Sequence, residues 1–345
     1  MSDHITLSAG SSQVSHITLG IPSSLSSNLR LTQAVDSQSN QLKVSPPTSQ
    51  ALPSPMVGSY SVLDIAFPSA KTGTYDFNVT SVYTHLLSLN STSNNFVFTF
   101  EPFLFADQTY NVTNAQLSVK TGDWPAPKIA GGVNGTFTSG AFTTQTNNLR
   151  AFNTTLATMV FSSSVATQTI FDVTANRTIT IAQTGAIQVT DFYDMTNLGK
   201  DLTNIVLPIP KYVQSATASD NIQSVATLTA APASDGTNTV TFTPRYSTVR
   251  AGSTTSTRIS YSLPAQNYLT SKGLGRYELN FQLFNNIKFV EPTMTVKIVT
   301  PMGFHLDSIS GQTFSISGNK ITLQVSQVTP LSNVSFVMDY QLDPF

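Results

Sequence analysis

Apolar and polar residues alternate along most of this chain. The stretch Phe96-Val97-Phe98-Thr99-Phe100 shows the pattern most clearly, because every second residue is a phenylalanine. A period of two places the three rings on one face of a β-strand and predicts that they lie in a core. Alternating segments of this kind recur along the chain with Gly, Pro, Ser and Asn between them, and no long amphipathic helix is evident. We therefore expect an all-β protein made of β-sandwiches.

The pattern also places the individual strands. The first two, at residues 4–7 and 14–19, are expected to form a hairpin or to be neighbours in a sheet. The remaining strands are expected at residues 29–31, 42–44, 60–67, 75–89, 96–105, 116–121, 169–181, 186–197, 205–210, 221–231, 240–243, 259–264, 275–284, 293–299, 314–316, 320–325 and 334–342. One or two helical turns are expected at 265–271.

Parts of the pattern occur twice. A strand containing Tyr83 precedes the phenylalanine strand, and a strand containing Tyr261 precedes a second alternating segment at 277–281. Each half then continues into a strand that contains a Val-Lys pair, at Lys120 and at Lys297. An offset of about half the chain indicates an internal duplication. We expect two tandem β-sandwich domains, residues 1–175 and 176–345, with Tyr83 and Tyr261 at corresponding strand positions.

Composition narrows the class of protein. Only 10% of the 345 residues are charged, against roughly 25% in an average soluble protein. The net charge is −1 and no basic or acidic block is present, which argues against a nucleic-acid partner. Cysteine is absent, so disulfides, thiolate metal sites and cysteine nucleophiles are excluded. Ser, Thr, Asn and Gln must therefore supply most of the polar surface.

Seven Asn-x-Ser/Thr acceptor sequences point to an extracytoplasmic location. They are candidate glycosylation sites at Asn78, Asn90, Asn111, Asn134, Asn153, Asn176 and Asn333. Asn90 and Asn134 are the best candidates, because polar and Gly-rich stretches surround them. No signal peptide and no membrane span is evident, and we expect both to have been removed from an excised ectodomain.

Catalytic chemistry finds little support in the sequence. The four histidines, His4, His16, His85 and His305, show no metal-ligand spacing, and His85 is expected to be packed beside the core. His4 and His16 are expected to meet across the N-terminal hairpin as a structural pair. No nucleophile elbow, phosphate loop or catalytic triad is found. We expect no enzyme activity, no catalytic residue, no metal site and no cofactor.

Two further features have a structural and a functional interpretation. Asp191 and Asp194 are three residues apart on one strand, which places them on opposite faces, a spacing that suits neither a paired-carboxylate site nor a calcium loop. Trp124 begins a Gly- and Pro-rich stretch, where packing against its own domain is favoured over service as an exposed contact.

The chain resembles ribophorin I, the non-catalytic subunit of the eukaryotic oligosaccharyltransferase. Val82-Tyr83-Thr84-His85 is similar to that family's Val-Tyr-Thr-His motif, and the segment from Arg177 to Gly199 is similar to the opening of its second domain. The best match is an ordered series of landmarks in the second half: 260–264, Tyr268, Leu269, Gly275, Tyr277, Leu279, Phe281, 295–298, Pro301 and Gly303. The resemblance covers the chain from about Ser59 to Phe345. The low charge departs from the eukaryotic members and favours an archaeal relative.

The resemblance implies a function without catalysis by this chain. It predicts an accessory subunit of an oligosaccharyltransferase, at the cell surface of an archaeon or in the endoplasmic reticulum lumen of a eukaryote. Its partners are expected to be a catalytic multi-span subunit and other accessory subunits, with membrane attachment through a segment absent from this sequence. The alternative is a structural cell-surface protein of an envelope layer or filament. A surface hydrolase or carbohydrate-binding module is a third, weaker interpretation.

Overall fold

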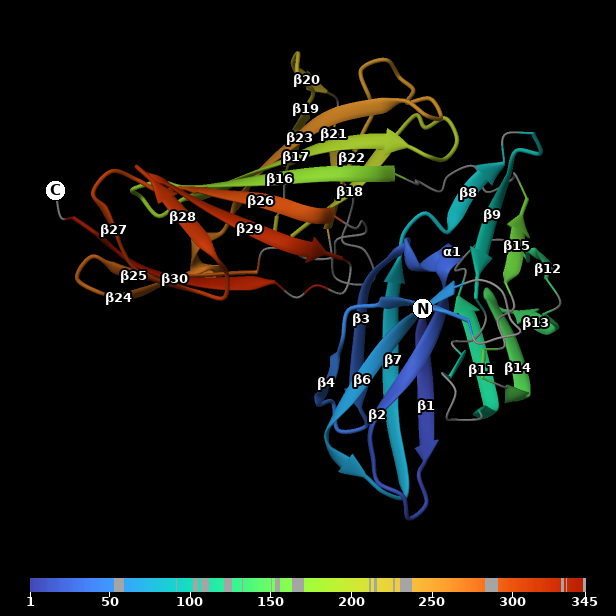
Figure 1. Ribbon diagram of the computed structural model, residues 1–345. Coiled ribbons are helices and arrows are strands. Elements are labelled where there is room, and N and C mark those ends of the chain that lie inside the picture. Colours follow the sequence, from blue (N-terminus) through green and yellow to red (C-terminus); the bar gives the residue numbers. More distant parts are fainter. Residues whose placement is uncertain are drawn as a thin grey trace. The chain divides into compact units, whose positions relative to one another are not determined.

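A computed structural model describes most of the chain as β-strands in two compact units, Met1–Ala166 and Thr167–Phe345 (Figure 1). The described residues are 1–52, 59–90, 92–101, 105–106, 112–120, 126–131, 133–149, 151–152, 156–162, 171–210, 212–213, 216–225, 227–229, 238–282, 291–329, 332 and 334–343. The expectation of an all-β fold is confirmed. The boundary between the units lies before the expected one at Ala175, because Ala175 is a buried residue inside a strand of the second unit.

The first unit begins with a large curled sheet whose strands pair in the order β1-β7-β3-β4-β6-β2-β10, with β5 also on β6. A second sheet has the order β11-β14-β13 and a third the order β12-β15-β9-β8. The elements are β1 (Ser2–Ser8), β2 (Val14–Pro22), α1 (Ser23–Ser26), β3 (Leu29–Asp36), β4 (Gln41–Val44), β5 (Thr48–Ala51), β6 (Ser59–Lys71), β7 (Thr74–Tyr83), β8 (Leu87–Asn90), β9 (Asn95–Phe100), β10 (Phe105–Ala106), β11 (Val112–Lys120), β12 (Lys128–Ala130), β13 (Gly135–Thr138), β14 (Ala141–Leu149) and β15 (Ala157–Phe161).

The second unit also has a large sheet, with the order β20-β19-β23-β17-β16-β26-β29-β28. Two smaller sheets have the orders β18-β22-β21 and β24-β25-β30-β27. The elements are β16 (Phe171–Ile181), β17 (Ile187–Asn197), β18 (Ile205–Ile209), β19 (Ala216–Ser219), β20 (Ser224–Val225), β21 (Thr227–Thr229), β22 (Asn238–Phe242), β23 (Thr254–Leu263), η1 (Ala265–Asn267), β24 (Leu269–Gly273), β25 (Arg276–Gln282), β26 (Glu291–Val299), β27 (Phe304–Ser310), β28 (Phe314–Ser317), β29 (Lys320–Val328) and β30 (Ser335–Leu342).

The two units repeat the same strand pairing. The sheet β12-β15-β9-β8 corresponds to β27-β30-β25-β24, and β11-β14-β13 corresponds to β26-β29-β28. In the large sheet of the first unit β7 lies between β1 and β3, as β23 lies between β17 and β19 in the second. Strand β6 has neighbours β4 and β2, as β22 has β21 and β18. The expected duplication is therefore visible in the connectivity of the described strands.

Individual registers extend this correspondence to single residues. Strands β11, β13 and β14 have the same lengths as β26, β28 and β29, and one offset along the chain relates all three pairs. In the large sheets Ala34 pairs with Val79, and its fully buried counterpart Ala218 pairs with Ile259. The match therefore holds at the level of individual pairs, and not only of strand order.

A glycine with the same backbone requirement also occurs in both units. Gly131 has φ +101° and Gly311 has φ +97°. A Cβ atom at Gly131 would lie 2.4 Å from the carbonyl oxygen of Leu156, and one at Gly311 would lie 2.7 Å from that of Ser335. Only glycine satisfies both the positive φ and the close approach, and the two glycines follow the corresponding strands β12 and β27.

Tyr83 and Tyr261 do not occupy corresponding positions, so that part of the prediction is wrong. With Val79 aligned on Ile259, Tyr261 corresponds to Ser81, while Tyr83 corresponds to Leu263 at the end of the strand. The error is a shift by an even number of positions, which leaves a side chain on the same face of its strand. Alternation in the sequence therefore does not reveal it.

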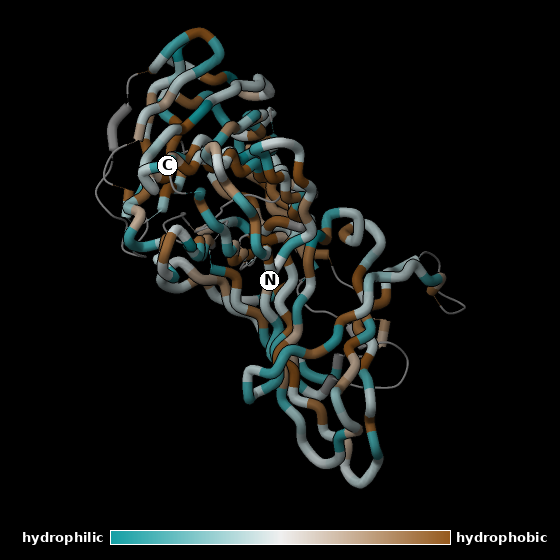
Figure 2. Tube along the Cα trace, turned by 90° about the vertical axis from the view of Figure 1, so that its left-hand side faces the viewer, coloured by the Kyte–Doolittle hydropathy of each residue, from teal (hydrophilic) through white to brown (hydrophobic). Residues whose placement is uncertain are grey.

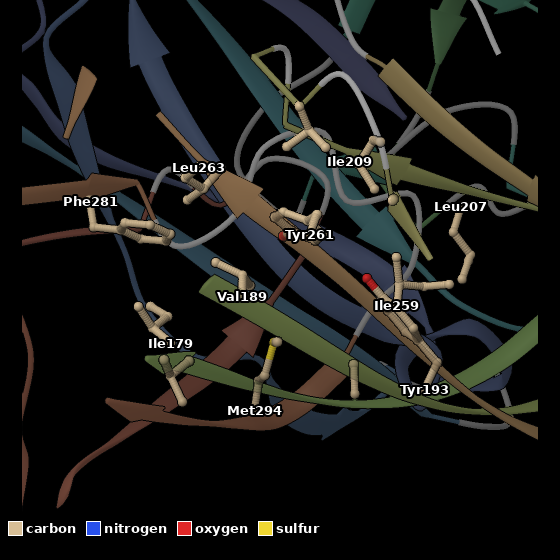
Figure 3. Packing of buried hydrophobic residues seen from close by; sticks show 14 of the residues in the cluster. Ile179, Val189, Tyr193, Leu207, Ile209, Ile259, Tyr261, Leu263, Phe281 and Met294 are labelled. Atoms are coloured by element: carbon tan, nitrogen blue, oxygen red, sulfur yellow. The ribbon is translucent and has the colours of Figure 1, made fainter. Parts of the chain in front are cut away.

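Alternating residues of facing strands build a hydrophobic core in each unit. In the second unit the core joins residues of all three sheets, among them Val189, Tyr261 and Phe281 (Figure 3). In the first unit Phe96 and Phe100 are fully buried, whereas Phe98 is half-buried and stacks on Phe100 with ring centroids 4.9 Å apart. Figure 2 shows the resulting alternation of hydrophobic and hydrophilic residues along the strands. The expected core position is confirmed for Phe100 and is only partial for Phe98.

The N-terminal strands do not form the expected hairpin. Strand β1 pairs with β7 and β2 pairs with β6, so His4 and His16 lie on strands separated by four others in the sheet order. The His4 Nδ1 atom lies 2.9 Å from the Asn78 side-chain oxygen. His85 is exposed with φ 58°, so its expected packing beside the core is also wrong. The hairpin prediction failed because β1 and β2 each pair with a strand that follows much later in the chain.

Candidate functional site

A polar groove of about 740 Å³ indents the surface of the second unit. Its walls come from the turn that follows β19, from the segment after β22, and from the first half of β23. Those segments lie close together because β19 and β23 are hydrogen-bonded neighbours. The lining residues include Asp220, Ile222, Arg245, Tyr246, Arg250 and the hydroxyl-bearing run 253–257.

An ion pair fixes one wall of the groove. Asp220 receives two hydrogen bonds from the Arg245 guanidinium, of which Nη2 to Oδ1 measures 2.8 Å. Asp220 Oδ1 also accepts the backbone N–H groups of Ile222 and Gln223 at 2.8 and 2.9 Å. These donors, with Arg245 first, hold the pKa of Asp220 well below its usual value. The carboxylate therefore stays charged and orders the turn, so it is unsuited to proton transfer near neutral pH.

Two large apolar side chains at the groove are exposed. Tyr246 is 82% exposed and Ile222 is 71% exposed, although most aromatic and branched residues described in this unit are buried. Exposed aromatic residues beside an arginine are typical of contact surfaces for other molecules. The adjacent face of β23 adds hydroxyl groups, with Thr254 hydrogen-bonded to Thr196 at 3.0 Å and Ser256 donating to Asp194.

The groove combines apolar contact with hydrogen-bond donors and acceptors, and this combination fits binding of a polar extended chain or a glycan. Within the described residues no group of three His, Cys, Asp or Glu side chains is placed to hold a metal ion. The described lining of the groove contains hydroxyls and carboxylates but no histidine to serve as a base for a hydroxyl nucleophile.

A second polar cluster is fully enclosed in the core of the same unit. Arg177 of β16 contacts Asp191 of β17 through Nε to Oδ1 at 2.6 Å and Nη2 to Oδ2 at 2.8 Å. The Tyr261 hydroxyl donates to Asp191 Oδ2 at 2.9 Å. Burial alone would lower the pKa of Arg177, but the adjacent carboxylate raises it above its usual value. The cluster is inaccessible to a ligand, so we assign it a structural role.

The cluster also settles the question raised by Asp191 and Asp194. Asp191 is 1% exposed and faces the core, whereas Asp194 is half-buried on the opposite face, where it accepts from Ser256. The expected separation of the two carboxylates is confirmed. Tyr193, one residue before Asp194, is buried, and burial raises its pKa above the usual value.

The candidate glycosylation sites fall into three groups. Asn90 and Asn134 are exposed. Asn90 is the last residue of β8, and its side-chain oxygen accepts the N–H groups of Thr92 and Ser93; Asn134 lies just before β13. Asn78 and Asn176 lie in strands with a partner on either side. Asn111, Asn153 and Asn333 lie outside the described residues, as does Trp124.

The sequence alone does not reveal the groove. Asp220 and Arg245 lie far apart in the chain, and their contact depends on the pairing of β19 with β23. A weak signal is present, because Asp220-Asn221 and Pro244-Arg245-Tyr246 are turn-forming sequences that carry charge in a chain with few charges.

Comparison with known proteins leaves the family open. No protein family and no curated protein matches the chain. An M1 zinc metallopeptidase from Deinococcus radiodurans aligns with 50% of this chain and 43% of its own length, at 18% identity and a TM-score of 0.33. The yeast LTA4 hydrolase structure aligns with 50% of this chain and 30% of its own, at 10% identity and a TM-score of 0.33. The chain spans less than half of either structure, and likeness at this level carries no argument.

In the part of the chain that the structure describes, no helix is both long enough and apolar enough to cross a bilayer.

Proposed function

We propose that this chain is the extracytoplasmic part of a non-catalytic accessory subunit of an oligosaccharyltransferase complex. It would work by binding and orienting polypeptide, while a multi-span partner subunit carries out glycan transfer. The ordered landmarks from Ser260 to Gly303 that resemble ribophorin I are the observation that carries this proposal. The groove on the same unit supports it, because Tyr246, Ile222 and Arg245 offer a recognition surface.

The proposal is tested by isolating the full-length protein from its native host after mild cross-linking. We expect a multi-span glycosyltransferase among the recovered proteins. A matched pair of variants adds a test of the groove: Tyr246→Ala should reduce the recovery, whereas Leu274→Ala should not, although Leu274 is also fully exposed. Recovery of this chain alone, or of a lattice of its copies, would count against the accessory-subunit proposal.

The extracytoplasmic location has its own test. We expect sugar on Asn90 and Asn134, because an acceptor asparagine must enter the transferase in an extended segment that an exposed loop can provide. Asn176 serves as the internal control, since its backbone is held between β17 and β26. Mass spectrometry of natively expressed protein decides the point. If neither Asn90 nor Asn134 carries sugar in a host that glycosylates its surface proteins, the extracytoplasmic location is contradicted.

A structural cell-surface role is the second candidate. It is favoured by the edges of β1 and β11 in the first unit, which offer backbone hydrogen-bonding groups without a described partner. Extended assemblies of the native protein, with no glycosyltransferase attached, would support this role.

A further inference from the structure

Among the described residues, the first unit has no counterpart of strand β16. In the second unit β16 lies between β17 and β26, antiparallel to the first and parallel to the second. The counterparts of these neighbours in the first unit are β1 and β11. Within the described part of the chain β1 pairs only with β7, and β11 pairs only with β14. One edge of each strand is thus left without a described partner.

The side chains beside this position differ in burial between the units. The core-facing residues of β17, from Val189 through Asp191 and Tyr193, are all buried. Their counterparts in the first unit are Met1, Asp3 and Ile5, which are half-buried. The register gives this match, because Asp3 pairs with Val79 as Asp191 pairs with Ile259.

The parallel neighbour shows the same difference. Ile298 of β26 is fully buried beside Ile179 of β16, whereas its counterpart Val119 of β11 is half-buried. A strand in this place therefore covers apolar side chains on both flanks in the second unit. In the first unit Val119 is less completely covered than Ile298, whereas Leu117, the counterpart of Val296, is buried as well.

Asp3 makes the position chemically specific. In the second unit the buried carboxylate of Asp191 is held by Arg177, which β16 supplies. Asp3 has its Oδ2 atom enclosed without a hydrogen-bond partner among the described residues. The titratable groups that face it are the Met1 ammonium, which donates to the Ser81 carbonyl oxygen at 2.9 Å, and the hydroxyl of Tyr83, whose pKa is raised by burial so that it stays uncharged. A buried carboxylate oxygen without a hydrogen bond costs free energy, and a binding partner that supplies a donor would remove that cost.

We propose that the first unit binds an extended segment of another protein as an added strand between β1 and β11. The segment would run antiparallel to β1 and parallel to β11, and it would place an arginine against Asp3. Its core-facing residues would be apolar and small or branched, like Val173, Ala175 and Ile179 of β16. Main-chain hydrogen bonds to the two edges would supply affinity, and the arginine together with the apolar positions would supply selectivity. This inference does not depend on the accessory-subunit proposal, and it uses the same two edges that favour the structural cell-surface role.

The chain's own β16 sequence provides the probe. A labelled synthetic peptide of residues 171–181 would be titrated into the full-length protein and followed by fluorescence anisotropy, with hydrogen exchange used to locate it. We expect saturable binding, with slower exchange at the amides of β1 and β11. A peptide carrying Glu in place of the arginine should bind at least tenfold more weakly. The Asp3→Asn protein, checked for folding by circular dichroism, should lose most of that discrimination.

Several results would overturn the proposal. Absence of binding would do so, as would equal binding of the two peptides to the unchanged protein. Slower exchange confined to β17 and β26 would mean that the peptide replaces β16 in the second unit. Concentration-dependent dimers that protect β1 and β11 and exclude the peptide would identify a second copy as the occupant, against a different protein.

Discussion

Replacing Arg177 by methionine should destabilise the second unit far more than the loss of an ordinary surface charge. Arg177 is 8% exposed and Asp191 is 1% exposed, and their two contacts measure 2.6 and 2.8 Å. Methionine keeps the apolar stem but leaves the carboxylate buried with only hydroxyl donors such as Tyr261. Removing one partner of a buried pair typically costs about 3–5 kcal/mol. We expect the free energy of unfolding of the second unit to fall by about that amount.

The measurement is urea unfolding of the full chain, with hydrogen exchange at β16 and β17 to assign the transition to the second unit. Two control variants separate the charge effect from loss of packing. Arg177→Met combined with Asp191→Leu removes both charges and should recover most of the loss, because no unpaired ion remains. Arg245→Met breaks the more exposed pair with Asp220 and should cost far less than Arg177→Met.

The reasoning would be refuted by either of two results. A loss below about 1 kcal/mol for Arg177→Met would mean that Asp191 finds another way to accommodate its charge. A double variant less stable than Arg177→Met alone would mean that packing, and not the pairing of charges, sets the cost.

The remaining predictions concern the first unit. Phe100→Ala should cost about 3–5 kcal/mol in a urea titration, and Phe98→Ala roughly half as much, because only Phe100 is fully buried; equal costs would contradict the observed burial. Burial raises the pKa of Asp3 to about 6, so ionisation of Asp3 lowers the free energy of unfolding as the pH rises from 3.8 through 6. Asp3→Asn should therefore recover up to about 3 kcal/mol at pH 8 but nothing at pH 3. A gain in stability that is independent of pH would exclude this cause. Gly131→Ala should destabilise the first unit by more than about 2 kcal/mol, because the φ of +101° is strained for alanine and the new Cβ atom would lie 2.4 Å from the Leu156 carbonyl oxygen. An unchanged melting temperature would argue against that backbone geometry.

Local pattern was enough to predict the fold class and most strands. The phenylalanines of β9 and the opposite faces of Asp191 and Asp194 follow from a period of two, and the helical turn after Leu263 follows the proline there. Pairing partners were less accessible to prediction. His4 meets Asn78 and not His16, because the pairing of β1 with β7 joins residues that no local signal connects. Non-local pairing is what alternation leaves undetermined.

The groove, too, could be predicted from the sequence only in part. Asp220 follows β19 and accepts the N–H groups of its own turn, a local motif that Asp36 repeats at the end of β3 with the N–H groups of Gln38 and Asn40. Arg245 reaches Asp220 because the segment after β22 brings it there. The turn could be predicted from the sequence, whereas the charge pair and the exposed Tyr246 beside it required the sheet.

Asp3 and Asp191 occupy corresponding positions of the duplication that the sequence alone does not align. Each follows a small hydroxyl residue, Ser2 or Thr190, and each pairs with an apolar residue of the next strand. The offset along the chain between these two acids is larger than the offset between the matched strands β11 and β26, so a fixed offset in the sequence does not align them.

The sheet register does align the two acids, and it then exposes the difference that matters. The carboxylate of Asp191 has an arginine from β16, whereas among the described residues the Oδ2 atom of Asp3 has no hydrogen-bond donor. An enclosed carboxylate oxygen without a donor is costly to keep unless something else occupies the position beside it. The physical cost of Asp3, more than the missing counterpart of β16, is therefore what points to a binding partner for the first unit.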